Sequence, residues 1–195
     1  MHPTADLMRE LEAFGIEHDR THHQRGARML NITRDTGELL AVLIQAGAAR
    51  RVLEIGTSNG YSTLWLAQAV QASGGDVTTV ELAADKHELA RVNFARAGLE
   101  RVIRQLRADA GAVLAASADA AFDFIFLDSE RAAYPAWWPA LRRVLAPGGT
   151  LVVDNASSHY GEMAGFLEAI RADPAFTCCL ASVGKGEFIA VKARD

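Results

Sequence analysis

The chain has 195 residues, a length that predicts one domain over residues 1–195 with a single substantial hydrophobic core. Its formal net charge is −4, so it lacks the basic field that a nucleic-acid partner requires. There is no apolar signal region and no apolar run of membrane-spanning length, so we expect no membrane partner and a cytoplasmic location. The adjacent Cys178 and Cys179 would point to opposite faces of a strand, which argues against a disulfide between them.

Two helices are predicted before the first strand. The first covers residues 4–18, with Thr4 as its N-cap and apolar residues at helical spacing. The second begins at Thr36, also as an N-cap, and runs to about residue 46. We therefore expect residues 1–47 to form a helical segment that packs on the rest of the domain.

From Arg51 onward, short apolar runs alternate with amphipathic stretches. Strands are expected over residues 52–55, 77–81, 102–107, 122–128, 150–154, 176–182 and 187–191. Helices are expected over residues 62–71, 85–97, 110–116, 135–145 and 161–172, and Ala146–Gly149 is expected to turn into the next strand. This alternation predicts an α/β fold, a mostly parallel sheet with helices on both faces. Only Val183–Gly186 separates the last two strands, which predicts an antiparallel hairpin at the sheet edge.

The first strand ends in a turn that favours a ligand site. Gly56 and Gly60 follow the strand, and a helix begins after them. A glycine there lets a ligand approach the backbone, and the start of the helix offers unpaired N–H groups. In an open α/β sheet, ligands usually bind at this first strand-to-helix corner.

Two carboxylates and one missing glycine narrow the identity of the ligand. Glu81 ends the second strand, beside the Gly56 turn, where it can accept hydrogen bonds from both hydroxyls of a ribose. Glu54 lies inside the first strand, where a buried carboxylate without a partner would be costly. This cost disfavours the alternative that the strand, turn and helix only pack together and bind no ligand. A dinucleotide site requires G-x-G-x-x-G, but Ser58 stands in place of the middle glycine. The pattern favours S-adenosylmethionine (SAM) over a nicotinamide cofactor.

Five segments follow one another in the order and at the spacing of a known family. They are Glu54–Ser62, Val80–Glu81, Phe122–Asp128, Leu145–Gly149 and Val153–Asn155. Together they resemble the metal-dependent O-methyltransferases, the group of the catechol and caffeoyl-CoA O-methyltransferases and their bacterial relatives, from about Met29 to the C-terminus. The resemblance implies a Rossmann-like class I methyltransferase fold, with a seven-stranded, mostly parallel sheet and an antiparallel C-terminal edge hairpin.

The same resemblance implies which residues bind SAM. The cofactor-binding set is Ile32, Glu54, Gly56, Thr57, Ser58, Ser62, Glu81, Asp109, Ala110 and Asp128. Within it, Gly56, Thr57 and Ser58 would line the methionine moiety. Ser62 would lie near the SAM carboxylate at the start of the helix, where N–H groups favour an anion.

Other members of the family pattern would enclose the nucleoside. Glu81 would hold the ribose, and Asp109 and Ala110 would lie against the adenine. The segment Asn31–Thr33, which includes Ile32, matches a short stretch that closes over SAM in the family. These contacts rest on the resemblance alone.

Three oxygen-bearing side chains predict a metal site. Asp128 ends the fourth strand, and Asp154 and Asn155 end the fifth, so neighbouring strands would bring them to one sheet edge beside the methyl donor. Two carboxylates and an amide suit a hard cation, Mg²⁺ above all, and leave room for water and two acceptor oxygens. Chelation lowers the pKa of a phenolic hydroxyl and fixes its oxygen in line with the methyl group. Taken singly, Asp154 and Asn155 read as ordinary strand-end and turn residues.

One position departs from the family pattern. The family usually has a lysine three residues after the first metal aspartate, as the base for the acceptor hydroxyl, and this chain has Arg131 there. A guanidinium stays protonated, so Arg131 would act by holding a phenolate or an acidic acceptor group by charge. Glu130 or a hydroxide on the metal could take the proton, and the sequence does not choose between them. Asp128 and Arg131 are thus the predicted catalytic residues.

The leading hypothesis is a SAM-dependent O-methyltransferase acting on a hydroxyl of a small catechol-like or phenolic acceptor, with a divalent metal chelating the acceptor. The alternatives are a metal-independent small-molecule SAM methyltransferase and a SAM-binding protein with little turnover. The segment Ala156–Tyr160 is shorter than in most relatives, so the acceptor is left open; His159 in it reads as a loop residue. A homodimer is also left open.

Overall fold

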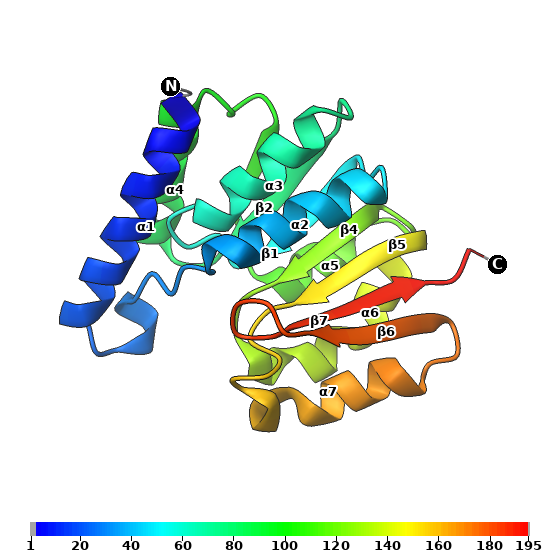
Figure 1. Ribbon diagram of the computed structural model, residues 1–195. Coiled ribbons are helices and arrows are strands. Elements are labelled where there is room, and N and C mark those ends of the chain that lie inside the picture. The colour runs from blue at the N-terminus through cyan, green and yellow to red at the C-terminus, as the bar shows by residue number, and fades with distance from the viewer. Residues whose placement is uncertain (1–2, 195) are drawn as a thin grey trace.

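The computed structural model describes residues 3–194, which form one seven-stranded sheet with helices on both faces (Figure 1). The strands are β1 (Arg51–Ile55), β2 (Asp76–Glu81), β3 (Ile103–Arg107), β4 (Phe122–Leu127), β5 (Leu145–Val153), β6 (Phe176–Ala181) and β7 (Glu187–Lys192). The α-helices are α1 (Pro3–Thr21), α2 (Arg34–Ala46), α3 (Tyr61–Gln71), α4 (Ala84–Ala97), α5 (Ala110–Ala116), α6 (Tyr134–Val144) and α7 (Tyr160–Ala172), and the short 3₁₀ helices are η1 (Arg25–Ala27) and η2 (Arg131–Ala133). Residues 1, 2 and 195 of the predicted domain lie outside the described residues.

The sheet has the strand order β3-β2-β1-β4-β5-β7-β6. Strands β1 to β5 pair in parallel, whereas β7 runs antiparallel to both β5 and β6. The predicted parallel sheet and edge hairpin are confirmed. The strand order reverses between β1 and β4, and the crevice at the carboxyl ends of such a pair is where open α/β sheets bind ligands.

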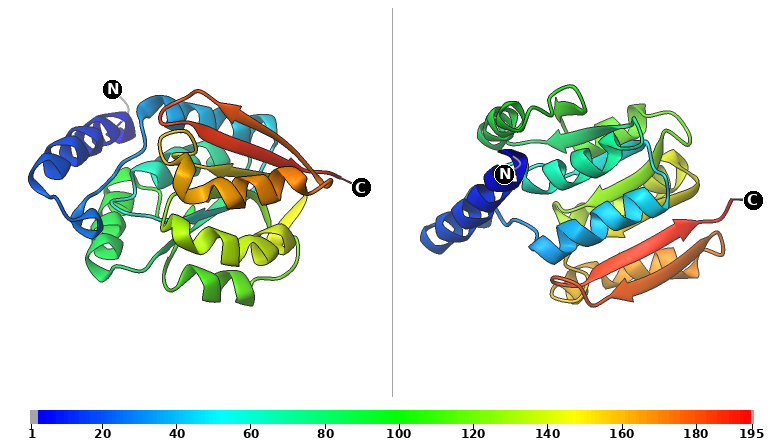
Figure 2. Two further views of the ribbon diagram at one scale, coloured as in Figure 1. Left: turned by 90° about the horizontal axis from the view of Figure 1, so that it is seen from below. Right: turned by 45° about the horizontal axis from the view of Figure 1, so that its top comes forward.

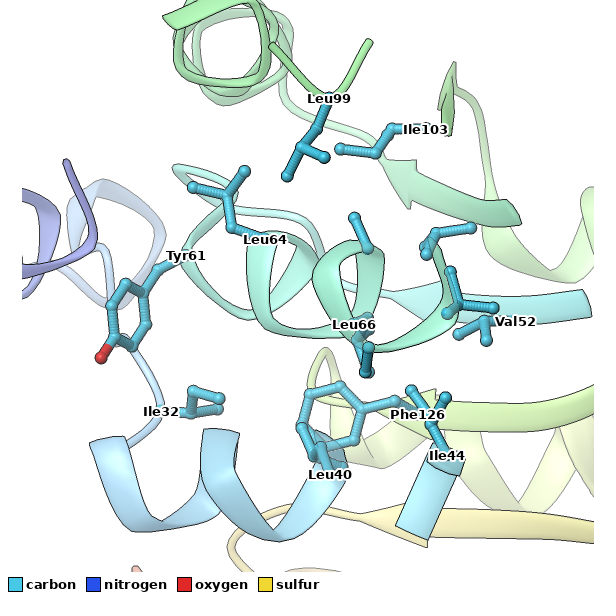
Figure 3. Close-up of a cluster of buried hydrophobic side chains, with 14 of the residues drawn as sticks. Ile32, Leu40, Ile44, Val52, Tyr61, Leu64, Leu66, Leu99, Ile103 and Phe126 are labelled. Carbon is cyan, nitrogen blue, oxygen red and sulfur yellow. The ribbon is translucent and has the colours of Figure 1, made fainter. Parts of the chain in front are cut away.

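Alternate residues of the central strands contribute to two different cores. Val52 of β1 faces a cluster that includes residues of α1, α2, α3 and α4, part of which is drawn in Figure 3. Leu53 and Ile55 face a second cluster, formed with α5, α6 and α7. This period of two is the mark of a strand buried on both faces. Figure 2 shows α2 and α7 on opposite sides of the sheet.

The N-terminal helices α1 and α2 pack against other helices, α1 against α3 and α4 and α2 against α3, and both begin at other residues than predicted. Leu7 and Leu11 of α1 are buried in the first core cluster, beside α3 and α4. Helix α1 begins at Pro3, so Thr4 lies inside it, and α2 begins at Arg34, so Thr36 is not its N-cap. The Thr36 hydroxyl instead donates to Glu187, far away in the sequence, at 3.0 Å. The Thr36 hydroxyl therefore binds a side chain that is distant in the sequence, and not the backbone at the start of α2 as predicted.

A second local prediction is also wrong. Strand β5 begins at Leu145, so the expected turn Ala146–Gly149 lies within it, at an irregular register against β4. Gly148 has φ +76°, a conformation that glycine adopts more readily than other residues, which explains why a glycine occupies this position. Both cysteines are free, as predicted. None of the described helices combines the length and the apolar content that a membrane span requires.

Candidate active site

Gly56 brings the end of β1 directly against the end of β4. Its φ of +107° is a conformation that side chains rarely adopt, and a Cβ there would lie 1.9 Å from the carbonyl oxygen of Asp128. The two strands stay paired up to Ile55 and Leu127, one residue before these positions. The predicted cofactor turn and the first predicted metal carboxylate are therefore neighbours.

Glu54 is fully buried beneath this turn, and three hydroxyls donate hydrogen bonds to its carboxylate. The donors are Ser62 at 2.5 Å, Thr79 at 2.6 Å and Thr63. Burial raises the pKa of Glu54 to about 7, and the three hydroxyls act against that rise. The expectation that Glu54 would lack a partner unless a ligand supplied one is wrong. The carboxylate ties β1 and β2 to the start of α3 and so holds the turn in place.

Glu81 lies where the sequence predicts, beside the turn at the end of β2. Its Oε2 accepts a hydrogen bond from the backbone N–H of Ser58 at 2.9 Å, and its Oε1 accepts from those of Leu82 and Ala83, also at 2.9 Å. Ser58 has φ +49°, an uncommon conformation for a residue with a side chain. The backbone thus fixes a half-exposed carboxylate at the edge of the crevice.

The segment that precedes α2 crosses over the same turn. Ser58 Oγ donates to the carbonyl oxygen of Met29 at 2.7 Å. Asp19 accepts from the backbone N–H groups of Met29 and Leu30, at 2.7 and 2.9 Å, and the Asn31 amide donates to a carbonyl of α1 at 3.0 Å. Leu30 has φ +52°, and strained backbone of this kind gathers at functional sites.

The remaining predicted cofactor residues lie along the same edge of the sheet. Thr57 is buried in the turn, and Ile32 is buried in the first core cluster (Figure 3). Asp109 follows β3 and caps α5 by accepting from the backbone N–H of Ala112 at 2.9 Å. Ala110 is buried at the start of that helix. Their contacts with a cofactor stay predictions.

Asp128, Asp154 and Asn155 meet at the carboxyl ends of β4 and β5. The Asn155 side-chain nitrogen lies 3.5 Å from Asp128 Oδ1 and also donates to Asp154 Oδ2. Asn155 has φ +64°, another left-handed residue at this edge. Burial and then the neighbouring Asp154 raise the pKa of Asp128 well above its ordinary value. Two carboxylates held this close repel each other unless a cation or a proton lies between them.

The donor set fits a divalent cation of the Mg²⁺ type. Two carboxylates and one amide oxygen are hard ligands, and Mg²⁺ keeps several waters when proteins bind it. Across residues 3–194 there is no metal-binding group of three or more His, Cys, Asp or Glu side chains. The Asn155 nitrogen faces both carboxylates, and the Asn155 oxygen accepts from the Ser158 hydroxyl at 3.4 Å, so the amide would have to turn to present its oxygen to a cation.

A fourth acidic residue, Glu187 at the start of β7, was missed by the sequence analysis. Its side chain is fully buried; one oxygen accepts from Thr36 and the other has no hydrogen-bond donor. Burial and the neighbouring Asp154 raise the pKa of Glu187 to about 10. In the sequence, an unbroken run of apolar residues follows Glu187, which predicts a buried strand. A glutamate at the start of such a strand is the signal from which its burial could have been predicted.

Arg131 does not point freely toward an acceptor. It is 6% exposed, and its guanidinium donates to Glu162 of α7 at 3.0 Å. Tyr134, close by, accepts a hydrogen bond from the backbone N–H of Ser129 at 2.8 Å, and burial raises the pKa of its hydroxyl well above the ordinary value. The ion pair competes with the predicted role of Arg131 as a holder of acceptor charge.

A cavity of about 380 Å³ lies away from these residues, at the amino-terminal ends of the strands. Arg50, Asp123, Gly148 and Arg194 are among its lining residues, and none of the predicted site residues is. In open α/β sheets the ligand crevice lies at the opposite, carboxyl edge, so we do not assign this cavity to the active site.

The parallel sheet with its antiparallel last strand, the glycine turn after β1 and the acidic edge after β4 and β5 define a Rossmann-like methyltransferase. A family model described as O-methyltransferase matches residues 5–193, so the chain belongs to the O-methyltransferase family. The predicted enzyme class is thereby confirmed.

Similar proteins agree with this assignment. A catechol O-methyltransferase of Mycobacterium tuberculosis is 36% identical over 64% of this chain and 56% of its own length. A putative O-methyltransferase of Mycolicibacterium vanbaalenii is 33% identical over 82% of this chain and 75% of its own. An O-methyltransferase of Bacillus cereus, solved in complex with SAH, superimposes with a TM-score of 0.79 at 26% identity, covering 96% of this chain and 90% of that one.

Replacing Gly56 with alanine tests the close approach of β1 and β4. The added Cβ meets the Asp128 carbonyl in a strained conformation, so we expect Gly56→Ala to lose more than about 1 kcal/mol of unfolding free energy. Gly165→Ala on α7 is the control, because nothing lies within 4 Å of a Cβ there and alanine favours a helix. Urea unfolding compares the two, and equal stabilities would contradict the role of Gly56.

Replacing Glu187 with glutamine tests its buried carboxyl group. A folded-state pKa raised from 4.5 to about 10 stabilises the fold at low pH, and this contribution is lost as the pH rises through that window. In chelator, we expect Glu187→Gln to gain in Tm over the wild type as the pH rises from 5 to 9. For one titrating group, the corresponding gain in the free energy of unfolding is at most about 1.4 kcal/mol per pH unit.

The control for that series is Glu168→Gln, on the exposed ion pair with Arg171. Its Tm difference from the wild type should stay flat over the same pH range. A flat difference for Glu187→Gln as well would show that the carboxyl group ionises normally in the folded protein.

Proposed function

We propose that this chain is a SAM-dependent O-methyltransferase that methylates a hydroxyl of a small catechol-like or phenolic acceptor. One observation carries the proposal: the glycine turn after β1 lies against the Asp128 backbone, and Asp128 meets Asp154 and Asn155. A cofactor at the turn and an acceptor at the acidic edge would therefore be adjacent. The Streptomyces achromogenes O-methyltransferase TomG, solved with SAM, supports the choice of cofactor, with a TM-score of 0.74 at 27% identity over 84% of this chain and 82% of that one.

The residues of the turn would hold the cofactor. Glu81, already oriented by three backbone N–H groups, would accept hydrogen bonds from the ribose hydroxyls. Gly56, Thr57 and Ser58 would line the methionine moiety, and Asp109 and Ala110 would lie against the adenine. Glu54 would act indirectly, by holding the turn through its three hydroxyl partners. The absence of a middle glycine at Ser58 fits a ligand without a pyrophosphate.

The acidic edge would hold the acceptor by means of a divalent cation on Asp128, Asp154 and Asn155. When bound, such a cation lowers the pKa of a phenolic hydroxyl and orients its oxygen. The protein's own contribution would be to hold three side chains with oxygen donors next to the methyl donor, two of which, Asp154 and Asn155, are almost inaccessible to solvent. The relative from M. tuberculosis named as a catechol O-methyltransferase supports this acceptor class.

The pairing of Arg131 with Glu162 favours a second candidate, a SAM-binding protein with little turnover. In that case the chain would bind SAM without methylating catechols at a useful rate. A metal-independent methyltransferase of another small molecule is the remaining alternative. A cytoplasmic location and a homodimer stay predictions.

Calorimetry with SAM and with NAD tests the cofactor. We expect binding of SAM and none of NAD, because the turn lacks the pyrophosphate pattern. Glu81→Gln should weaken SAM binding by about tenfold or more, since one carboxylate oxygen is replaced by an amide donor facing the same N–H groups and ribose hydroxyls. NAD binding without SAM binding would refute the proposal.

A panel of catechols, assayed with Mg²⁺ and then with chelator, tests the metal. We expect methylation with Mg²⁺, loss of activity with chelator, and a fall of about 100-fold or more for Asp154→Ala. Asp119→Ala, at an exposed ion pair far from the edge, is the control. Turnover that survives both chelation and Asp154→Ala would point to the metal-independent alternative, and SAM binding without turnover to the second candidate.

A further inference from the structure

The proposed reaction leaves a proton to be removed from the acceptor hydroxyl. A base for that proton must lie near Asp128 and must be able to release and accept a proton. Arg131 fails on chemistry, because a guanidinium stays protonated, and it is already paired with Glu162. The Tyr134 hydroxyl is buried and bonded to the backbone of Ser129. The glutamate of this segment, Glu130, accepts a hydrogen bond from the backbone N–H of Ala132 in η2.

A lysine from a different part of the chain reaches this edge. Lys185 lies in the turn between β6 and β7, and the pairing of Val153 with Phe188 places that turn next to the end of β5. Figure 1 shows the turn, in red, at the same edge as the loop that leaves β5. The position follows from the antiparallel hairpin, which returns the chain to the carboxyl edge.

The Lys185 backbone is fixed against the loop that follows Asn155. Its carbonyl accepts hydrogen bonds from the backbone N–H groups of Ser157 and Ser158, at 3.3 and 3.0 Å. The next carbonyl, of Gly186, accepts from the backbone N–H of Ala156 at 2.7 Å. A Cβ on Gly186 would lie 2.0 Å from the Ser157 hydroxyl, so the two loops touch. The acidic edge and the lysine are thus parts of one rigid corner.

The Lys185 side chain is available for a ligand. The chain has three lysines, and Lys86 and Lys192 donate to backbone carbonyls at 2.7 Å. Lys185 is exposed and forms no hydrogen bond or ion pair through its side chain with any described residue. Burial and Asp154 raise the pKa of Asp128, and the charge of Lys185 acts against them, so Lys185 and Asp128 interact electrostatically.

We propose that Lys185 is the catalytic base of this enzyme, acting in the place where Arg131 cannot. The inference rests on the proposed methyltransferase function. In the step, the acceptor oxygen forms a bond to the methyl carbon, and the carbon–sulfur bond of the sulfonium breaks with its electron pair passing to sulfur. The hydroxyl proton passes to the neutral Lys185 nitrogen, which becomes an ammonium and later releases that proton to water. SAM becomes its thioether product, and the acceptor becomes a methyl ether.

Other titratable groups surround the turn and must be separated from Lys185. Asp35 at the start of α2 accepts from the backbone N–H of Gly184 at 3.1 Å, and Glu187 begins β7. Asp128 and Asp154 lie at the strand ends, and His159, whose Nδ1 lies 2.8 Å from Ser158 Oγ, is in the adjoining loop. Of these, the imidazole of His159 is the competing base, because histidine is the side chain that most often serves as a general base.

The test compares Lys185→Met, Lys185→Arg and His159→Gln with the wild type, using catechol, SAM and Mg²⁺. We expect kcat to fall by about 100-fold or more in both lysine variants, because arginine keeps the charge but not the ability to accept a proton. The rising limb of the kcat–pH profile should be lost in Lys185→Met and kept in His159→Gln. SAM affinity by calorimetry and Tm should be nearly unchanged in both lysine variants, since the Lys185 side chain is exposed and forms no hydrogen bond or ion pair with the described residues.

Four results would overturn the proposal. Full activity in Lys185→Arg would make the residue a source of charge rather than a base. Loss of the rising limb in His159→Gln, with the limb kept in Lys185→Met, would assign the proton to His159. A wild type that binds SAM but methylates no catechol would refute both the proposed function and the role of Lys185 as its base. An active wild type together with an equally active Lys185→Met would refute only the role of Lys185.

Discussion

The structure depends on how closely the ends of β1 and β4 approach each other. The carbonyl of Asp128 occupies the space that a side chain at position 56 would need, and only a glycine with φ +107° allows both strands to end there. This single contact joins the turn that would hold a cofactor to the carboxylate that would hold a metal. A reaction between two bound groups gains most when both are held at a fixed distance, and here that distance is set by backbone atoms.

Buried polar groups then make this corner stiff. Glu54 accepts from three hydroxyls on α3 and β2, and Glu81 accepts from three backbone N–H groups. The Glu54 carboxylate would be costly to bury alone, but each carboxylate, together with its partners, fixes the orientation of the elements around it. Ser58 and Asn155, both with positive φ, lie on either side of the contact. Strain of this kind persists only where the surroundings hold it, which is what these hydrogen bonds do.

Much of this could be predicted from the sequence, because it follows from periodicity and from residues at strand ends. The alternation of strands and helices fixes a parallel sheet, and a parallel sheet brings Glu81, Asp128 and Asp154 to one edge. What failed depends on long-range contacts. Thr36 is a plausible N-cap by local rules, yet its partner Glu187 is 151 residues away. The hydroxyls around Glu54 and the ion pair of Arg131 were likewise invisible, since no local pattern specifies which side chain a buried charge will meet.

The start of α2 links the two halves of the site. Thr36 donates to Glu187, which lies against Asp154, and Asp35 accepts from the backbone N–H of Gly184 in the β6–β7 turn. The segment just before this helix bonds through Met29 to Ser58 in the cofactor turn. The residues predicted to close over a cofactor are therefore continuous with those that fix the acidic edge. Since hydrogen bonds on one short segment support both, displacement of that segment would disturb the glycine turn and the acidic edge together, even though the two lie on different strands.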